Sequence, residues 1–202
     1  MKRRCFFWVV ALFVATIAFV GCEMEDPQAP RMEQVEVELT DRAGEAVDLG
    51  LSVLWADDNV AGRFAWGEVE SKSYFSELGY QYCENGTYIE IGKNITGSKY
   101  DAARMLWGGK WRMPTEKEFL ELLDKCDTED NGRGSIKVTG PNGNYIYFKE
   151  EKMITGNSGY WTATQFGSNA GFSWAAAMSW NCFTQGIAKY NGLLIRPVMD
   201  RE

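Results

Sequence analysis

The chain has 202 residues, of which 28 are acidic, 21 are basic and none is histidine. Its net negative charge disfavours binding to the phosphate backbone of nucleic acids. The absence of histidine excludes Ser-His and Cys-His catalytic pairs and any zinc or iron site that needs an imidazole ligand.

The first 22 residues have the layout of an export signal. Residues 2–4 are Lys-Arg-Arg, residues 5–20 carry no charge, and Gly21 precedes Cys22. The uncharged run is long for a signal and short for a membrane-spanning helix. This order of parts resembles the lipobox of bacterial lipoproteins, in which the cysteine receives a lipid and the chain is cut before it. We therefore expect residues 1–21 to be a signal peptide and Cys22 to be lipidated. A cleaved signal with a chance cysteine and an uncleaved anchor are the alternatives.

Cleavage at this place would change the charge and define the rest of the chain. It removes three basic residues and no acid, so that 18 basic residues remain against 28 acidic ones and the net charge becomes −10. Residues 22–32 are polar and contain two prolines, which predicts a flexible tether. Residues 33–202 are long enough for one domain with a sizeable core.

The residues just after Cys22 also suggest a location. The acidic run at 23–26 resembles the short signals with which some Gram-negative bacteria send lipoproteins to the cell surface. We expect an outer-membrane lipoprotein that faces outward, and a periplasm-facing one is the alternative. The mature chain keeps Cys83, Cys126 and Cys182, an odd number that allows at most one disulfide. Three small buried thiols are equally compatible with the sequence.

The first half of the domain predicts short strands and a long loop. Alternating apolar residues at 34–39 predict a half-exposed strand. Residues 47–56 and 64–67 predict further strands with glycine between them. The polar, glycine-bearing stretch at 70–98 predicts a loop-rich region.

Two helices are expected in the middle of the chain. Ser98 and Asp101 form a variant of the capping box, which predicts a short helix through Trp107. Thr115 and Glu118 form a full capping box at the start of a second helix. That helix carries one apolar stripe, made of Phe119, Leu122, Leu123 and Cys126.

After the second helix the pattern changes to a period of two. Residues 136–138 and 145–148 flank Asn142-Gly143, which predicts a hairpin. Residues 160–164, 172–180, 186–190 and 193–198 predict further short strands. The sequence therefore predicts a loop-rich α+β domain, with two short central helices among antiparallel strands and hairpins.

Four segments carry a family resemblance: 47–56, 107–118, 160–164 and 192–198. Together they resemble the Fibrobacter-type major paralogous domain, a group of exported bacterial proteins. That group is similar to the formylglycine-generating-enzyme-like branch of the C-type-lectin-like fold. The resemblance implies a compact, Trp-rich, C-type-lectin-like domain. Most members have no assigned activity, and the enzymes of the wider superfamily need a close cysteine pair or iron-binding histidines. Fold likeness therefore implies no catalysis here, and we expect no enzyme and no cofactor.

The charged residues that we expect to hold the fold together are Arg112, Glu118 and Arg196. Arg112 and Arg196 lie among apolar neighbours, so each guanidinium must find acceptors inside the domain. Backbone carbonyls, or carboxylates such as Glu68 or Glu118, are the expected partners. Direct contact of an arginine with a ligand is the alternative.

Aromatic residues supply the candidate ligand contacts. Most of the tryptophans are expected in the core. Four rings in the loop-rich region could stack on a sugar or a peptide, or else cover the core: Tyr74, Phe75, Tyr80 and Tyr82. Residues 127–132 place oxygen ligands as a calcium loop does, but Val138 stands where the loop needs a glutamate. A solvated turn is therefore favoured, and no metal is expected.

The sequence leads to one preferred function and two others. The preferred one is a lipid-anchored surface protein whose domain binds or adheres to a glycan or a protein without catalysis. A structural or assembly component of a cell-surface complex is the alternative. An enzyme, such as a carboxylate-pair glycosidase, is least favoured. The lipid anchor is the expected contact with the membrane, and nucleic acid is not expected as a partner.

Overall fold

The computed structural model describes residues 43–149, 159–178 and 182–202. The predicted signal peptide, Cys22, the tether, the strand at 34–39 and Trp180 lie outside these residues. In the described part, short strands and two short α-helices alternate with loops. The elements, in chain order, are β1 (Ala46–Val47), β2 (Val53–Ala56), the 3-10 helix η1 (Glu77–Gly79), β3 (Cys83–Glu84), β4 (Thr87–Tyr88), α2 (Ala102–Trp107), α3 (Glu116–Lys125), β5 (Asp127–Asp130), β6 (Ser135–Thr139), β7 (Tyr145–Lys149), β8 (Tyr160–Gln165), β9 (Phe172–Ala177), β10 (Phe183–Ala188) and β11 (Val198–Asp200).

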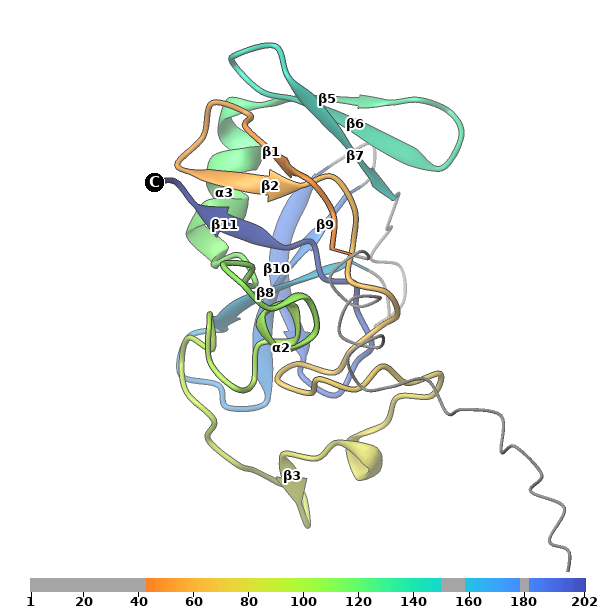
Figure 1. Cartoon of the computed structure of the whole chain (residues 1–202). Coiled ribbons are helices and arrows are strands. Elements are labelled where there is room, and N and C mark those ends of the chain that lie inside the picture. Colours follow the sequence, from red (N-terminus) through yellow and green to blue (C-terminus); the bar gives the residue numbers. More distant parts are fainter. Residues whose placement is uncertain (1–42, 150–158, 179–181) are drawn as a thin grey trace, which may run out of the picture.

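The strands form four small sheets, in which neighbouring strands pair antiparallel. Their orders are β1-β2-β11, β10-β9-β8, β3-β4 and β5-β6-β7. The first sheet joins the beginning of the described chain to its end, because β11 pairs with β2. The β5–β7 sheet lies at the top of Figure 1, α2 lies near the centre, and η1 and β3 project at the bottom. The α+β class is therefore confirmed.

Helix α3 forms as its capping residues predict. The Thr115 hydroxyl accepts a hydrogen bond from the Glu118 amide, and the Glu118 carboxylate accepts one from the Thr115 amide. Phe119 and Leu122 are buried on its apolar face. Helix α2 is also confirmed, but its cap is Asp101 and not Ser98, because the Asp101 side chain accepts from the Arg104 amide.

The predicted hairpin is confirmed as β6 and β7, and it packs against the segment before β2. Asn142 and Asn144 each donate a side-chain hydrogen bond of 2.8 Å to the carbonyl of Asp48. Gly140 allows this approach, because a Cβ at that position would overlap the carbonyl of Leu49. The hairpin thus closes over the N-terminal part of the domain.

Several predicted strands are shorter than expected. Residues 47–56 form two strands, because the chain reverses at Gly50, whose φ of 78° favours glycine. In the segment at 64–67 only Phe64 forms a bridge, to Leu193, and in the segment at 193–198 a regular strand begins only at Val198. In these segments the residues outside the strands pair only through single bridges. The apolar pattern shows that the residues are buried, but it does not show how far regular pairing extends.

Two more boundaries differ from the prediction. β10 runs from 183 to 188, three residues earlier at its start than expected. Residues 127–130 are not a turn but the exposed edge strand β5, which pairs with β6. Pairing overrides the turn-forming composition there.

The core consists of two clusters. One cluster lies between α3, β2, β11 and the β6–β7 hairpin, and it includes Trp55, Phe119 and Phe148. The other surrounds α2 and includes Phe64, Trp66, Trp107, Trp111 and Trp161. Among the described tryptophans only Trp174 is not buried, so the expectation that most tryptophans form the core is confirmed.

Candidate functional site

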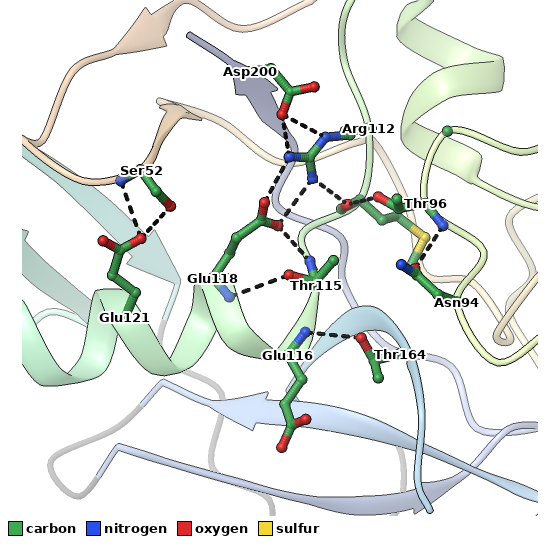
Figure 2. A network of polar contacts seen from close by, with 12 residues as sticks. Ser52, Asn94, Thr96, Arg112, Thr115, Glu116, Glu118, Glu121, Thr164 and Asp200 are labelled. Carbon is green, nitrogen blue, oxygen red and sulfur yellow. Dashed lines mark hydrogen bonds and ion pairs between the residues drawn. The ribbon is translucent and has the colours of Figure 1, made fainter.

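A network of polar contacts joins Arg112 to helix α3 and strand β11 (Figure 2). The guanidinium makes two bonds to the Glu118 carboxylate, of 2.7 and 3.0 Å. It also bonds to Asp200 on β11, at 2.5 Å from Nη2. A backbone bridge between Arg112 and Val198 lies beside these contacts. The structure therefore brings Arg112 and Glu118 together as partners, whereas Glu68 bonds to neither arginine and pairs with Lys72 instead.

Inside this network the positive charge of Arg112 is paired with two carboxylates. Burial alone would lower the pKa of Arg112, but its bonds to Glu118 and Asp200 raise the pKa above the ordinary value. The bond from Arg112 lowers the pKa of the Asp200 carboxyl. Glu118 also accepts from the Thr115 amide at 2.7 Å. The Arg112 and Glu118 side chains are largely buried and bonded to each other, so this pair suits a structural role.

The middle of α3 is tied to the residue that precedes β2. Glu121 accepts from the amide of Ser52 at 3.1 Å and also from the Ser52 hydroxyl (Figure 2). Glu121 also pairs with Lys125. Burial raises the pKa of Glu116, whose carboxylate points away from the network. Only the Glu116 amide takes part, as a donor to the Thr164 hydroxyl.

Asp101, which the sequence predicted only as the partner of Ser98 in a capping-box variant, is a buried carboxylate. It is fully buried and accepts hydrogen bonds from the amides of Gly97, Arg104 and Met113, at 2.7 to 3.1 Å. Burial raises its pKa, although these backbone bonds act in the opposite direction. One side chain thus joins a loop, the start of α2 and the segment before α3.

Arg196 occupies a separate buried site. Its guanidinium donates to the carbonyls of Ala56, Asp57 and Tyr147 and to the side-chain oxygen of Asn59, at 2.6 to 2.9 Å. It also lies over the ring of Phe148, at 4.5 Å from the ring centroid. Arg196 therefore connects the end of β2 to β7, and its side chain is buried.

The four candidate stacking rings do not form one exposed surface. Tyr74 is 78% exposed, but Phe75 is half-buried against Gly192. Tyr80 is only 3% exposed and its hydroxyl donates to the Trp66 carbonyl, so of the two alternatives this ring covers the core. Tyr82 is half-buried and packs edge-on against Tyr80. Rings in this loop mainly cover the core, because nearby glycines let them approach the backbone.

Lys189 is a buried cation that sequence reasoning missed. It is 1% exposed, and its ammonium lies 4.1 Å from the ring centroid of Trp66 and 2.8 Å from the side-chain oxygen of Gln165. Burial lowers its pKa to about 8, although the negative charge of Glu90 opposes this shift. The position of this lysine in an otherwise uncharged stretch, 186–190, was the one feature of the sequence that could have indicated its burial.

Replacing Lys189 with methionine should change how stability depends on pH. Between about pH 8 and the ordinary value of 10.5, folded Lys189 is neutral while the unfolded side chain still holds its proton. The unfolded state then binds more protons, so wild-type stability rises with pH, by at most about 1.4 kcal/mol per unit from this group. The Lys189→Met variant lacks this rise.

Urea unfolding of both proteins at several pH values measures the difference. The Cys126 thiol, whose pKa burial raises to about 11, acts in the opposite direction above its ordinary value of 9.0. It is present in both proteins, so it cancels when the variant is subtracted. A difference that stays constant with pH would contradict the assignment.

A groove of about 600 Å³ lies between helix α2 and the loop that follows β2. Its floor consists of the buried residues Val60, Phe64 and Trp107, and the half-buried Val69 and Leu106 extend it. Backbone bonds fix the floor, because Val60 and Phe64 bond to Ile195 and Leu193 at 3.0 Å. We call this cavity the α2 groove.

The rim of the α2 groove is polar and carries negative charge. Asp58, Glu70 and Ser71 are exposed there, and Asn59 is half-buried. The side-chain oxygen of Asn59 accepts a hydrogen bond from Arg196, and the backbone amide of Asn59 donates to the Asp58 carboxylate. An apolar floor with a few polar groups at its edge is the usual composition of a ligand-binding cavity. No local sequence pattern predicts this cavity, because residues 58–71 and 106–107, which line it, are far apart in the chain.

Two further observations concern membranes and metals. Among the residues that the structure describes, no helix is both long and apolar enough to span a bilayer. Nor do three or more acidic or cysteine side chains of this part gather where they could hold a metal ion. No protein-family model, curated protein or solved structure matches the chain.

Proposed function

We propose that this chain is a lipid-anchored outer-membrane lipoprotein whose domain binds a ligand at the cell surface without catalysis. The observation that carries the binding function is the α2 groove, a concave apolar floor with a polar rim on a fixed backbone. The sequence pattern around Cys22 supports the anchor. A C-type-lectin-like fold belongs to the same proposal and is supported by the family resemblance.

The polar groups of the domain support binding in preference to catalysis. Glu118 and Asp200 are engaged by Arg112, and Asp101 is engaged by three backbone amides. A general acid or base must reach the substrate with a lone pair or a proton available. At the α2 groove the ionisable side chains are Asp58 and Glu70, with neither histidine nor cysteine beside them.

Replacing Cys22 with serine should abolish lipidation and shift the protein from the membrane fraction to the soluble fraction. Serine has no thiol to accept the lipid, and the negative mature chain has little affinity for anionic lipid headgroups. Mass spectrometry and fractionation measure both effects. Cys83→Ser is the matched control, since Cys83 is a half-buried thiol of the domain. Unchanged mass and fractionation of Cys22→Ser would refute the anchor.

Protease treatment of intact cells tests which way the domain faces. If the protein is at the surface, the domain is exposed to protease before lysis. Protection in intact cells and digestion after lysis would instead place it in the periplasm. The full chain, purified in detergent, can then be applied to glycan and peptide arrays, and the absence of binding to both would contradict a binding domain.

A further inference from the structure

We infer that the α2 groove binds a polypeptide segment in which an apolar side chain lies next to lysine or arginine. This inference rests on the proposed binding function and specifies its ligand. It depends on the shape of the floor, on the sign of the charge at the rim and on the sequence that precedes the domain.

The floor of the groove is suited to an inserted side chain. Its largest rings are already packed, since Phe64 is 1% and Trp107 is 9% exposed. Trp107 also packs edge-on against Trp111, with 5.3 Å between ring centroids. Stacking on a sugar needs an open ring face, which these rings do not offer. A cavity with an apolar floor instead accepts an apolar anchor, as the buried centre of a protein interface does.

The charge at the rim selects against anionic ligands. Both ionisable residues of the lining, Asp58 and Glu70, are acidic, and the lining contains no lysine or arginine. Within the described ranges neither carboxylate forms an ion pair with a basic side chain. The mature chain is also strongly negative. A cation next to the apolar anchor is therefore attracted to the rim, whereas phosphate and carboxylate groups are repelled.

Charge also argues against the chain's own N-terminal segment as the occupant. Gly44 lies against the Trp107 ring, so the chain enters the domain beside the groove. The sequence from 23 to 41 contains seven acidic residues and one arginine, and so has the same sign as the rim. An external basic segment is the complementary partner.

Binding of the detergent-purified full chain to three immobilised peptides tests the inference. The first peptide has a phenylalanine between lysines in a Gly-Ser background, the second has glutamates in place of the lysines, and the third has serine in place of the phenylalanine. We expect binding to the first peptide alone. Asp58→Asn combined with Glu70→Gln should weaken it about five- to twenty-fold at low salt. Asp124→Asn combined with Glu129→Gln, which removes two exposed charges elsewhere, should leave it unchanged.

A second variant tests the place of binding. Ala61 is an exposed residue of the lining, so a tryptophan at this position can occupy the groove without displacing a core side chain. Ala61→Trp should therefore abolish binding with little change in the melting temperature. Equal binding of the lysine and glutamate peptides, lost in Ala61→Trp, would overturn the ligand class and keep the binding function. Binding to glycans that is lost in Ala61→Trp would also overturn the ligand class and keep the binding function. Full binding of the lysine peptide by Ala61→Trp would overturn the site. Binding to no peptide and no glycan would overturn both the inference and the proposed function.

Discussion

Replacing Arg196 with alanine is expected to lower the free energy of unfolding by about 3–5 kcal/mol. The side chain is buried, and its removal leaves acceptors at Ala56, Asp57 and Tyr147 without a donor. Each such buried group costs about 1–3 kcal/mol when left unsatisfied. The contact with the Phe148 ring is lost as well.

Denaturant unfolding measures this loss, and Arg201→Ala is its matched control. Arg201 also bonds to a backbone carbonyl, that of Leu51, and pairs with Asp48, but its side chain is partly exposed. A surface ion pair of this kind contributes at most about 1 kcal/mol. Similar effects of the two substitutions would show that the burial of Arg196 is not what makes it important.

Arg112→Ala is expected to destabilise the domain by about 2–4 kcal/mol. Most of this comes from Glu118, which is largely buried and would keep its charge without its cation. Asp200 contributes less, because its side chain is 74% exposed and its ion pair is screened by water. Thermal melts of Arg112→Ala and Asp200→Asn separate the two contributions.

The Asp200 contribution should also depend on pH. The bond from Arg112 lowers the folded pKa of Asp200 below its ordinary value of 3.8. The stabilisation is therefore complete above that value and is lost as the pH falls through the lower folded pKa. A melting temperature for Arg112→Ala within about a degree of the wild type would refute the structural role of the arginine.

The parts of the fold that could be predicted from the sequence are those that local spacing determines. The Thr115–Glu118 capping box and the Asn-Gly turn each act within a few residues, and both formed as expected. Glu118 could be named as a partner of Arg112 because the two are close in sequence. The partners of Arg196 could not, because they lie 49 to 140 residues away.

The candidate site depends on contacts between residues that are far apart in the sequence. The loop at 58–71 reaches α2 only in the folded domain, so the groove left no local pattern. Tyr80 could not be placed in the core for a related reason. Its neighbours are polar and suggest an exposed loop, yet its ring packs against Tyr82 and Tyr88 and its hydroxyl donates to the Trp66 carbonyl. Lys189 was missed because one lysine near the end of a short strand looks like an ordinary solvated residue.

The pairing of β11 with β2 has a consequence for the order in which the protein is made and folded. The first strands of the domain leave the ribosome well before their partner, β11, has been synthesised. Contacts such as Arg201 to Leu51 and Arg196 to Asn59 close loops of 150 and 137 residues. Closing loops of this length before their contacts form slows folding. The first sheet therefore cannot be completed until the ribosome has passed β11, and until then β2 lacks one of its two neighbouring strands.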